Sequence, residues 1–327
     1  MKKISFVIPF YNEGENLRKI YDELLKVSSQ LPRYAVEYLF MDNHSTDNSQ
    51  AVVKEIAAKN PQVTVVRLSR NFGFQANILS GLLLCTGDAA IQIDADGEDD
   101  PTLILEFIHY WEQGYKVVYG IRKKRNESIF LTFQRKIFYR ILNFLSSIPI
   151  PLDSGDFRLL DRKVIECLKS FKEANPYLRG IISYAGFNQI GVSYNRRPRY
   201  DGVSKFKWWD YFQLAWDGIT SFSRKPLALA TWIGFGFAFL SFSGMFVYLL
   251  IHLFIGTRLP GFTTIVLFQL FLAGIQLICL GVLGAYISRI FEDVKNRPRS
   301  IIEEVVSLDK TSESIQAHKN ANTQFTL

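Results

Sequence analysis

Two long uncharged stretches constrain the fold of this chain more than any other feature. No Asp, Glu, Lys or Arg occurs from Pro226 to Gly256 or from Phe262 to Ser288. A helix needs about 20 apolar residues to cross the hydrocarbon of a bilayer, and both stretches exceed that length. A core helix of a soluble protein rarely combines such length with such apolarity. The sequence therefore predicts a two-helix transmembrane domain over residues 226–291.

The charges that flank these stretches predict an orientation. Arg224 and Lys225 precede the first stretch, basic residues follow the second between 289 and 299, and Arg258 lies in the connecting loop. Because Lys and Arg collect on the cytoplasmic side of a membrane, both outer flanks should face the cytoplasm. We therefore expect a multi-pass inner or plasma membrane protein with cytoplasmic termini. Its cytoplasmic tail should span residues 292–327 and end in disorder.

Strand-like and helix-like segments alternate over residues 1–120. Short apolar runs indicate strands, and between them lie segments with apolar residues at helical spacing. Such alternation predicts parallel strand pairing and an α/β sandwich. The expected strands are Ile4 to Phe10, Tyr38 to Met41, Val63 to Leu68, Ala89 to Ile93 and Val117 to Tyr119, and the expected helices are Asn16 to Ser28, Asp47 to Lys59, Gln75 to Cys85 and Thr102 to Gln113.

An acidic turn follows the fourth expected strand. Five carboxylates lie between Asp94 and Asp100, where Gly97 and Pro101 break regular structure. Asp94 and Asp96 are two residues apart, so in extended backbone their side chains point the same way. Two such carboxylates can hold a hard cation such as Mg²⁺. A solvated acidic turn is the alternative interpretation.

The expected position of this turn in the sheet favours the metal site. Ligands of parallel α/β sheets bind beyond the carboxyl ends of the strands. Asp42, the turn from Pro9 to Glu13 and the pair Asp94 and Asp96 all fall at such ends. Each placement is inferred independently, and all of them put polar residues at the edge of the sheet where a ligand would bind.

Two further segments combine basic and aromatic residues, near 127–148 and 206–223. This mixture is typical of helices that lie on a membrane surface, although ordinary amphipathic packing helices show it too. The net charge of +7 calls for an acidic partner. Because no helix-turn-helix, zinc-finger or RNA-binding signature is present, we assign the charge to the bilayer and to phosphates, not to nucleic acid.

Four motifs lie in order along the chain, over residues 6–13, 42–45, 94–96 and 154–158. Together with the two-helix tail, they resemble family 2 glycosyltransferases of the GT-A fold, and more narrowly the polyprenyl-phosphate glycosyltransferases. These include bactoprenol glucosyltransferases and dolichyl-phosphate mannose synthases. The Gln-x-x-Arg-Trp signature of processive synthases is not found, which argues against chain elongation. The motifs are Phe6-Val7-Ile8-Pro9-Phe10-Tyr11-Asn12-Glu13, Asp42-Asn43-His44-Ser45, Asp94-Ala95-Asp96 and Ser154-Gly155-Asp156-Phe157-Arg158.

The resemblance implies an inverting, metal-dependent enzyme with a GT-A domain over residues 1–225. The donor would be a nucleotide sugar, with UDP favoured, and the acceptor a polyprenyl phosphate such as undecaprenyl phosphate. Mg²⁺ or Mn²⁺ would stabilise the charge that grows on the leaving diphosphate. A homo-oligomer, for example a tetramer, is compatible with the family. The alternative from another class is a non-catalytic membrane scaffold, or a lipid-phosphate-binding module, derived from such an enzyme.

The resemblance also implies roles for residues on the donor side. Asp94 and Asp96 would bind the metal and the diphosphate, Asp96 being also assigned to catalysis. The first motif would hold the nucleotide, and Asp42 would contact the nucleoside. Arg199 and Lys205 lie on a Gly-containing loop that would close over the diphosphate. From the first motif, the nucleotide-binding residues are Pro9, Tyr11 and Glu13.

On the acceptor side, Asp156 occupies the position treated as catalytic. Its carboxylate could orient the acceptor phosphate or a neighbouring Arg as readily as take a proton. A salt bridge with Arg158 or Arg162 is the structural alternative. The residues expected to hold the lipid phosphate are Arg122 and Arg135, whose rigid guanidinium forks suit phosphate, together with Ser204.

Two places depart from the family pattern. The second motif usually reads Asp-Asp-Gly-Ser, whereas Asn43 and His44 stand here in place of the second acid and the glycine. How the nucleoside is held is therefore open, and we expect His44 to be a turn residue. The residue two positions after Asp96 is usually Gln, and here it is Glu98. Its extra charge would either strengthen cation binding or repel the diphosphate.

Overall fold

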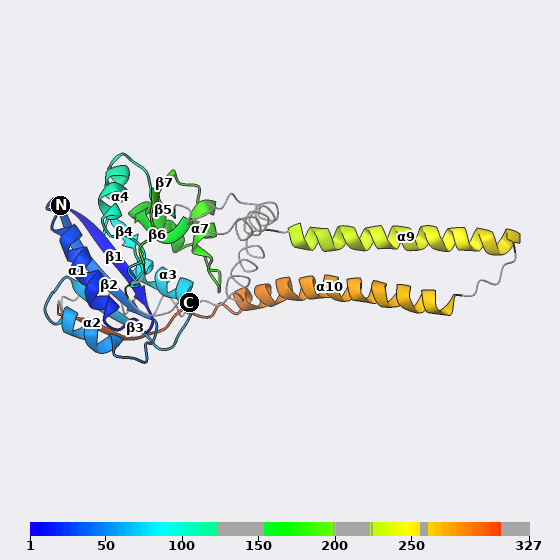
Figure 1. The fold of residues 1–327 in the computed structure, drawn as a ribbon, viewed down its shortest axis with the longest axis horizontal. Coiled ribbons are helices and arrows are strands. Elements are labelled where there is room, and N and C mark those ends of the chain that lie inside the picture. The colour runs from blue at the N-terminus through cyan, green and yellow to red at the C-terminus, as the bar shows by residue number, and fades with distance from the viewer. Residues whose placement is uncertain (123–153, 199, 201–222, 224, 256–260, 309–327) are drawn as a thin grey trace.

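An α/β sandwich and two long helices make up the computed structural model, which describes residues 1–122, 154–198, 200, 223, 225–255 and 261–308 (Figure 1). The sandwich is built on an eight-stranded sheet with strand order β7-β5-β6-β4-β1-β2-β3-β8. All neighbouring strands run parallel except β6 and β8, which run antiparallel to their neighbours. The predicted α/β fold with a mostly parallel sheet is therefore confirmed. The strands are β1 (Lys2–Phe10), β2 (Tyr34–Asp42), β3 (Val63–Leu68), β4 (Ala89–Gln92), β5 (Val117–Arg122), β6 (Ser154–Asp161), β7 (Gln189–Tyr194) and β8 (Ile302–Ser307).

Helices cover both faces of the sheet because successive side chains of each strand point to opposite faces. In β1, Phe6 and Ile8 belong to one buried cluster, and Val7 belongs to the other. The first cluster is completed by α1 (Asn16–Ser28), α2 (Ser49–Ala57) and α4 (Leu103–Glu112). The second is completed by α3 (Phe74–Leu84), α6 (Arg162–Leu168) and α7 (Leu178–Tyr184).

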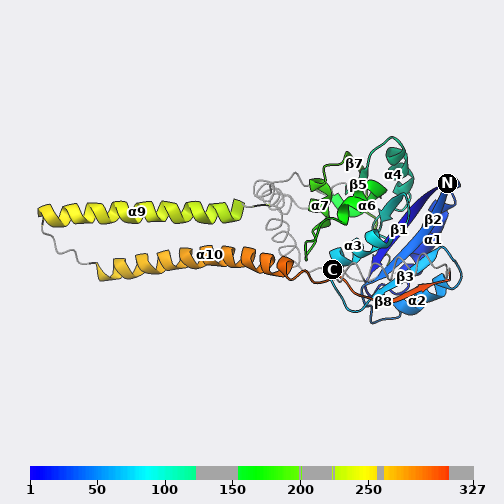
Figure 2. The same cartoon turned by 180° about the vertical axis from the view of Figure 1, so that it is seen from behind.

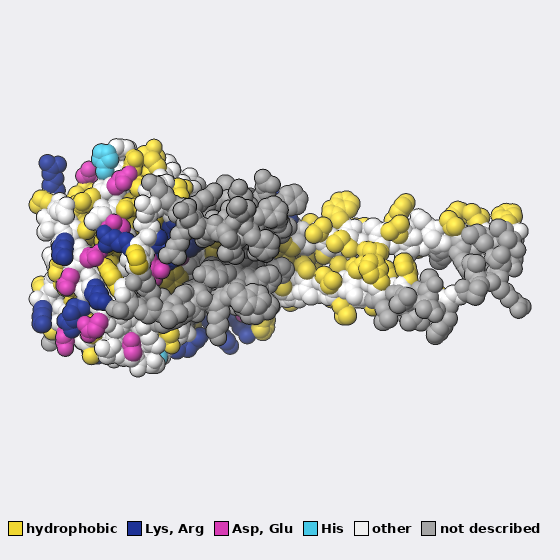
Figure 3. Space-filling model, viewed as in Figure 1, with side chains coloured by type: hydrophobic (Ala, Val, Ile, Leu, Met, Phe, Trp, Pro, Cys, Tyr) yellow, Lys and Arg dark blue, Asp and Glu magenta, His cyan; other side chains and the backbone are white. Residues whose placement is uncertain are grey.

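The two long helices are α9 (Lys225–Ile255) and α10 (Phe262–Val294). They project from the sandwich side by side, and the chain runs out along α9 and back along α10 (Figures 1 and 2). Within them, Lys225–Gly244 and Phe271–Val294 have mean hydropathies of 1.6 and 1.9, and neither segment is buried by the rest of the chain. Apolar side chains cover the described part of these helices, whereas charged side chains gather on the sandwich (Figure 3). By length and composition both helices can cross a membrane.

The chain returns to the sheet after α10. Residues 302–307 form the edge strand β8, which pairs with β3, so part of the segment expected as a tail belongs to the sandwich. Residues 309–327 and most of the two expected interface helices, near 127–148 and 206–223, lie outside the described residues. The sheet is thus assembled from segments on both sides of the long helices.

Candidate active site

The loops that follow β1 and β2 are tied together by hydrogen bonds. The Asn12 amide donates to Ser45 Oγ (2.9 Å), and the Thr46 amide donates to Asn12 Oδ1 (2.7 Å). The Glu13 amide donates to Ser49 Oγ (3.0 Å). Asn12 has a φ of 56°, a conformation that Asn tolerates better than most residues. The first and second motifs, which are far apart in sequence, therefore form one surface.

Other predicted residues of the first motif lie on or beside this surface. Pro9 pairs with Met41 of β2, beyond the point where β4 ends opposite Val7. Its missing amide therefore removes no hydrogen bond to β4. Tyr11 and Glu13 are half-buried in the loop that follows.

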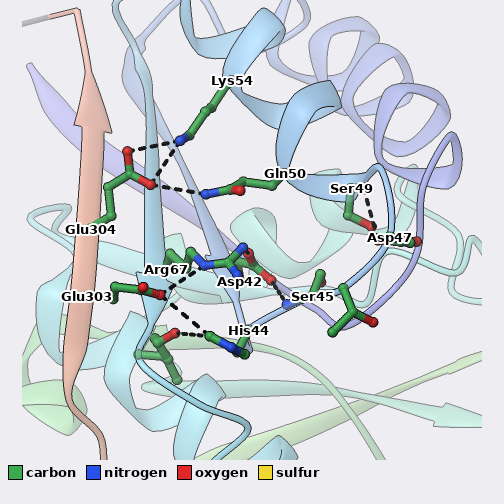
Figure 4. A network of polar contacts seen from close by, with 12 residues as sticks. Asp42, His44, Ser45, Asp47, Ser49, Gln50, Lys54, Arg67, Glu303 and Glu304 are labelled. Atoms are coloured by element: carbon green, nitrogen blue, oxygen red, sulfur yellow. Dashed lines mark hydrogen bonds and ion pairs between the residues drawn. The ribbon is translucent and has the colours of Figure 1, made fainter.

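Asp42 is the last residue of β2 and is completely buried. The Ser45 amide donates to Asp42 Oδ1 (2.7 Å), and Arg67 Nη1 donates to Oδ2 (3.0 Å) (Figure 4). A buried carboxylate requires such partners because desolvation of its charge is costly. The nucleoside contact implied by the resemblance would require the atoms that cover Asp42 to move.

The two departures in the second motif have structural roles. Asn43 Nδ2 donates to Asn71 Oδ1 (2.9 Å), and Asn43 Oδ1 accepts from the Phe72 amide (3.0 Å). His44 has a φ of 65°, in the left-handed region where glycine is the usual residue. Its Nδ1 lies 3.1 Å from the Leu68 carbonyl oxygen. Asn43 therefore joins the second motif to the Asn71 loop, and His44 occupies the turn that a glycine would favour.

The acidic turn begins directly after β4. Gln92 Nε2 donates to Asp94 Oδ1 (2.9 Å), and Asp96 Oδ1 accepts from the Glu98 amide (3.1 Å). Burial raises the pKa of Asp94 well above its ordinary value, and the nearby carboxylates of Asp99 and Asp96 raise it further. Carboxylates this close repel one another, and a cation would relieve that repulsion.

The donor set fits a divalent metal that shares its coordination with a substrate. Among the residues that the structure describes, no three His, Cys, Asp or Glu side chains are grouped to enclose a metal. Mg²⁺ is commonly held by only one or two carboxylates together with substrate phosphates. Asp94 and Asp96 offer hard oxygen ligands of this kind at the end of β4. Their roles as metal ligands remain a prediction.

Glu98 is paired with a cation from a distant segment. Its carboxylate forms an ion pair with Arg196, and its carbonyl oxygen accepts from the Arg197 amide (2.9 Å). Arg197 also pairs with Asp100 (2.6 Å). The extra negative charge at Glu98 is thus compensated by Arg196. We therefore expect Glu98 to add little to the affinity for a cation and to repel the diphosphate only weakly.

The same distant segment packs on the backbone of the acidic turn. The Tyr200 amide donates to the Asp96 carbonyl oxygen (3.1 Å). Gly97 has a φ of 75°, and a Cβ atom at this position would lie 2.1 Å from the Tyr200 ring. Glycine is therefore required at position 97 both by the backbone conformation and by the close approach of Tyr200.

Asp156 lies on β6, between β4 and β5 in the sheet. Arg179 Nε and Nη2 donate to its two carboxylate oxygens at 2.9 and 2.8 Å. Arg158, one of the two expected partners, lies at 3.5 Å, whereas Arg162 donates to the Gly87 carbonyl oxygen (2.7 Å) instead. Arg179, from α7, belongs to no motif, so no signal in the sequence indicated it.

The arginines decide the charge of Asp156. Burial acts to raise its pKa, but Arg179 and Arg158 outweigh burial and lower the pKa to about 2. The carboxylate is therefore ionised at neutral pH and is a weak base. This charge state favours a role in orienting Arg179 or a phosphate over a role in proton transfer.

Arg122 is the last residue of β5, and its guanidinium lies beside a carboxylate of the acidic turn. Its Nε donates to the Tyr194 hydroxyl (3.2 Å), and its Nη2 lies 3.4 Å from Asp99 Oδ1. Arg122 also lowers the pKa values of Asp94 and Asp156. In the sheet register, the end of β5 lies beside the start of β6, and the end of β4 lies on the other side of β6, so Arg122, Asp156 and Asp94 lie at the same edge of the sheet. The predicted residues Arg135, Arg199, Ser204 and Lys205 lie outside the described residues.

The motifs that form this site match a known family. The model for "Glycosyl transferase family 2" covers residues 5–169, from β1 to the end of α6. The chain belongs to glycosyl transferase family 2. The predicted family membership is therefore confirmed.

Relatives within family 2 match almost the whole chain. The uncharacterized glycosyltransferase YkcC of Bacillus subtilis is 40% identical over 306 residues, which are 93% of this chain and 94% of that protein. The SfII prophage-derived bactoprenol glucosyl transferase of Shigella flexneri is 37% identical over 304 residues, 92% of this chain and 97% of that protein. Because matches of this length include the segments of both long helices, the similarity is not confined to the sandwich.

Among solved structures, the chain is similar to the mannosyltransferase PcManGT from Pyrobaculum calidifontis in complex with GDP-Man and Mn²⁺. It is 17% identical, has a TM-score of 0.45, and covers 67% of this chain and 62% of that chain. At this similarity, the nucleotide and the metal are properties of that complex alone.

Proposed function

We propose that this family 2 glycosyltransferase transfers a monosaccharide from a nucleotide sugar, UDP-linked by preference, to a polyprenyl phosphate. The observation that carries the proposal is the convergence of Asp94, Asp156 and Arg122 at one end of a sheet attached to two long apolar helices. The bactoprenol glucosyl transferases among its relatives support a lipid phosphate acceptor. Undecaprenyl phosphate is the acceptor of choice for a test.

On the donor side, Asp94 and Asp96 would hold Mg²⁺ or Mn²⁺. The bound metal would supply Lewis-acid stabilisation of the diphosphate leaving group. Asp42 and the first-motif residues Pro9, Tyr11 and Glu13 would hold the nucleoside. Arg199 and Lys205 would close over the diphosphate and exclude water.

On the acceptor side, Arg122, Arg135 and Ser204 would bind the lipid phosphate. A phosphate oxygen is already ionised near neutral pH, so it can attack the anomeric carbon, with inversion, without a strong base. This agrees with an Asp156 whose pKa is about 2. We assign Asp156 to orienting Arg179, whose guanidinium would in turn attract the acceptor phosphate.

We also propose that the acceptor phosphate attacks the sugar at the cytoplasmic face of the membrane. The basic residues that flank α9 and α10 support this orientation through the excess of Lys and Arg on the cytoplasmic side. The two apolar helices would then hold the sandwich against the lipid that carries the acceptor. A tetramer or another homo-oligomer is compatible with this arrangement.

A lipid-labelling assay in sealed vesicles tests reaction and orientation together. Vesicles that contain the protein and undecaprenyl phosphate receive Mg²⁺ and a labelled nucleotide sugar, UDP-sugars first. We expect label in the lipid when the cytoplasmic face is outside, none in vesicles of the opposite orientation, and none with Asp96→Asn. Absence of labelled lipid with every donor would contradict the reaction, and labelling only in the opposite orientation would contradict the membrane face.

A non-catalytic scaffold is the competing function, and calorimetry separates it from an enzyme. The departures at Asn43, His44 and Glu98 suggested it, but each of these side chains has a structural partner here. A scaffold should show no metal-dependent binding of UDP, whereas the enzyme should bind UDP more tightly when Mg²⁺ or Mn²⁺ is present.

A further inference from the structure

The strand that follows the membrane helices contributes a carboxylate to the nucleotide side of the sheet. β8 pairs with β3, and the pairing shifts between Arg67 and Leu68. Glu304 pairs with Arg67 and Ile302 pairs with Leu68, so Glu303 has no partner in the register. Irregularities of this kind redirect a side chain away from the regular alternation of a strand.

The Glu303 side chain points toward Arg67 and His44 (Figure 4). Its Oε2 accepts from Arg67 Nε (3.0 Å) and lies 3.5 Å from His44 Nδ1. Arg67 Nη1 in turn donates to the buried carboxylate of Asp42 (3.0 Å). One guanidinium thus bridges a carboxylate from β8 and a carboxylate from β2.

The exposures of these side chains decrease along the bridge. The side chain of Glu303 is 47% exposed, that of Arg67 is 15% exposed, and that of Asp42 is completely buried. Asp42 also pairs with Arg67 in the β2–β3 register. The bridge therefore leads from the surface of the edge strand to the carboxylate at the end of β2.

We propose that Glu303 is a positioning residue for the nucleotide donor and acts through Arg67 on Asp42. The inference rests on the proposed function, in which Asp42 contacts the nucleoside. With Glu303 present, Arg67 is fixed at two of its nitrogens, and its charge is shared between two carboxylates. Without Glu303, the whole charge acts on Asp42 and competes with the donor for its oxygens. Donor affinity should fall while the chemical step is preserved.

The chain supplies a matched control in the next residue. Glu304 also accepts hydrogen bonds, from Lys54 Nζ (2.9 Å) and Gln50 Nε2 (3.0 Å), but both donors lie on α2 (Figure 4). Loss of Glu304 therefore weakens the attachment of the same strand without reaching Arg67 or Asp42. A purely structural role of β8 would be disturbed by both changes.

The test compares Glu303→Ala, Glu303→Gln and Glu304→Ala in the full-length protein. Affinity for UDP with Mg²⁺ is measured by calorimetry, and donor KM, lipid KM and kcat by lipid labelling. For Glu303→Ala we expect a five- to tenfold rise in the Kd of UDP and in donor KM, with kcat and lipid KM within twofold of wild type. Glu303→Gln keeps an acceptor for Arg67 but not the charge, so its Kd should lie between those of wild type and Glu303→Ala. Glu304→Ala should bind UDP as wild type does.

Three outcomes would overturn the inference. The first is an unchanged UDP affinity in Glu303→Ala, and the second is an equal loss of affinity in Glu304→Ala. In both, wild-type protein still binds UDP, so the proposed function stands. The third is a wild-type protein that binds no UDP with either metal, which overturns the UDP donor of the proposed function as well. Thermal unfolding of each variant identifies a loss of affinity that comes from misfolding, and Glu303→Gln, the mildest change, then decides the matter.

Discussion

Asp156 shows how two arginines can override burial at a single residue. The carboxylate is 8% exposed, a position at which burial alone favours the neutral form. Its two-point contact with Arg179 reverses that preference and lowers the pKa to about 2, from an ordinary value of 3.8. A lowered pKa means that the pair stabilises the fold above about pH 4, and that this contribution is lost as the pH falls toward 2.

Arg179→Gln should therefore destabilise the protein at neutral pH. The change removes the two-point partner of the buried Asp156 and leaves only the weaker contributions of Arg158 and Arg122, which should cost about 3 kcal/mol. In the variant the pKa of Asp156 rises, so protonation at lower pH relieves the penalty. The difference in unfolding free energy between wild type and variant should stay near its full value down to about pH 5 and shrink as the pH falls below about 4, as measured by denaturant unfolding in detergent. Arg18→Gln, which breaks only exposed ion pairs with Glu15 and Glu55, should show no such trend. An unchanged stability of Arg179→Gln at pH 7 would refute this account.

At the scale of elements, the acidic turn is shaped by a segment more than 90 positions away in the sequence. Arg196 forms an ion pair with Glu98, and the amides of Arg197 and Tyr200 donate to the carbonyl oxygens of Glu98 and Asp96. The Tyr200 ring lies against Gly97. The geometry of Asp94 and Asp96 should therefore depend on this contact as well as on β4.

Gly97→Ala tests that dependence against a matched glycine. Gly97 and Gly114 both have positive φ, 75° and 103°, but a Cβ atom at Gly114 meets nothing within 4 Å. Both substitutions should carry backbone strain of about 1–2 kcal/mol, whereas only Gly97→Ala displaces Tyr200. We expect Gly97→Ala to weaken Mg²⁺-dependent UDP binding at least tenfold, and Gly114→Ala to leave it unchanged, by calorimetry. Equal affinities in the two variants would show that the Tyr200 contact does not shape the turn.

At the scale of the whole molecule, α10 docks on the loop that leads into α7. Asp293 Oδ1 accepts from the Ala174 amide (2.8 Å), and Arg299 Nε donates to the Glu173 carbonyl oxygen (2.8 Å). The same loop continues into α7, which carries Arg179. The end of a long apolar helix is thereby connected to the segment that holds Asp156.

Asp293→Ala should loosen this connection at one identifiable amide. Loss of the acceptor should increase hydrogen exchange in the segment 171–177 at least fivefold, because the Ala174 amide loses its hydrogen bond. In the described part of the chain, the neighbouring Glu292 accepts a hydrogen bond from the side chain of Asn175 and not from a backbone amide. Exchange of the segment should therefore stay near wild type in Glu292→Ala, as followed by mass spectrometry. Identical exchange in Asp293→Ala and wild type would count against the docking contact.

Local sequence patterns predicted much of the fold. The helix from Asn16 to Ser28 and the strand from Val63 to Leu68 were predicted with the bounds that the structure shows, because each has a clear apolar period and breaks at both ends. The strand β8 was missed. Its sequence, IEEVVS, lacks the regular alternation of apolar and polar residues that indicates a strand, and only pairing with β3, far away in the sequence, makes it one.

The sequence by itself determined the α/β class, the two long apolar helices and the family. These follow from the period of the apolar residues, from their number, and from motifs read in order. Only the tertiary structure decided which charges meet: Arg179 with Asp156, Arg196 with Glu98, and Glu303 with Arg67. The physical reason is that an ion pair depends on distance in space, and these partners belong to elements that the chain brings together only when the sheet is complete.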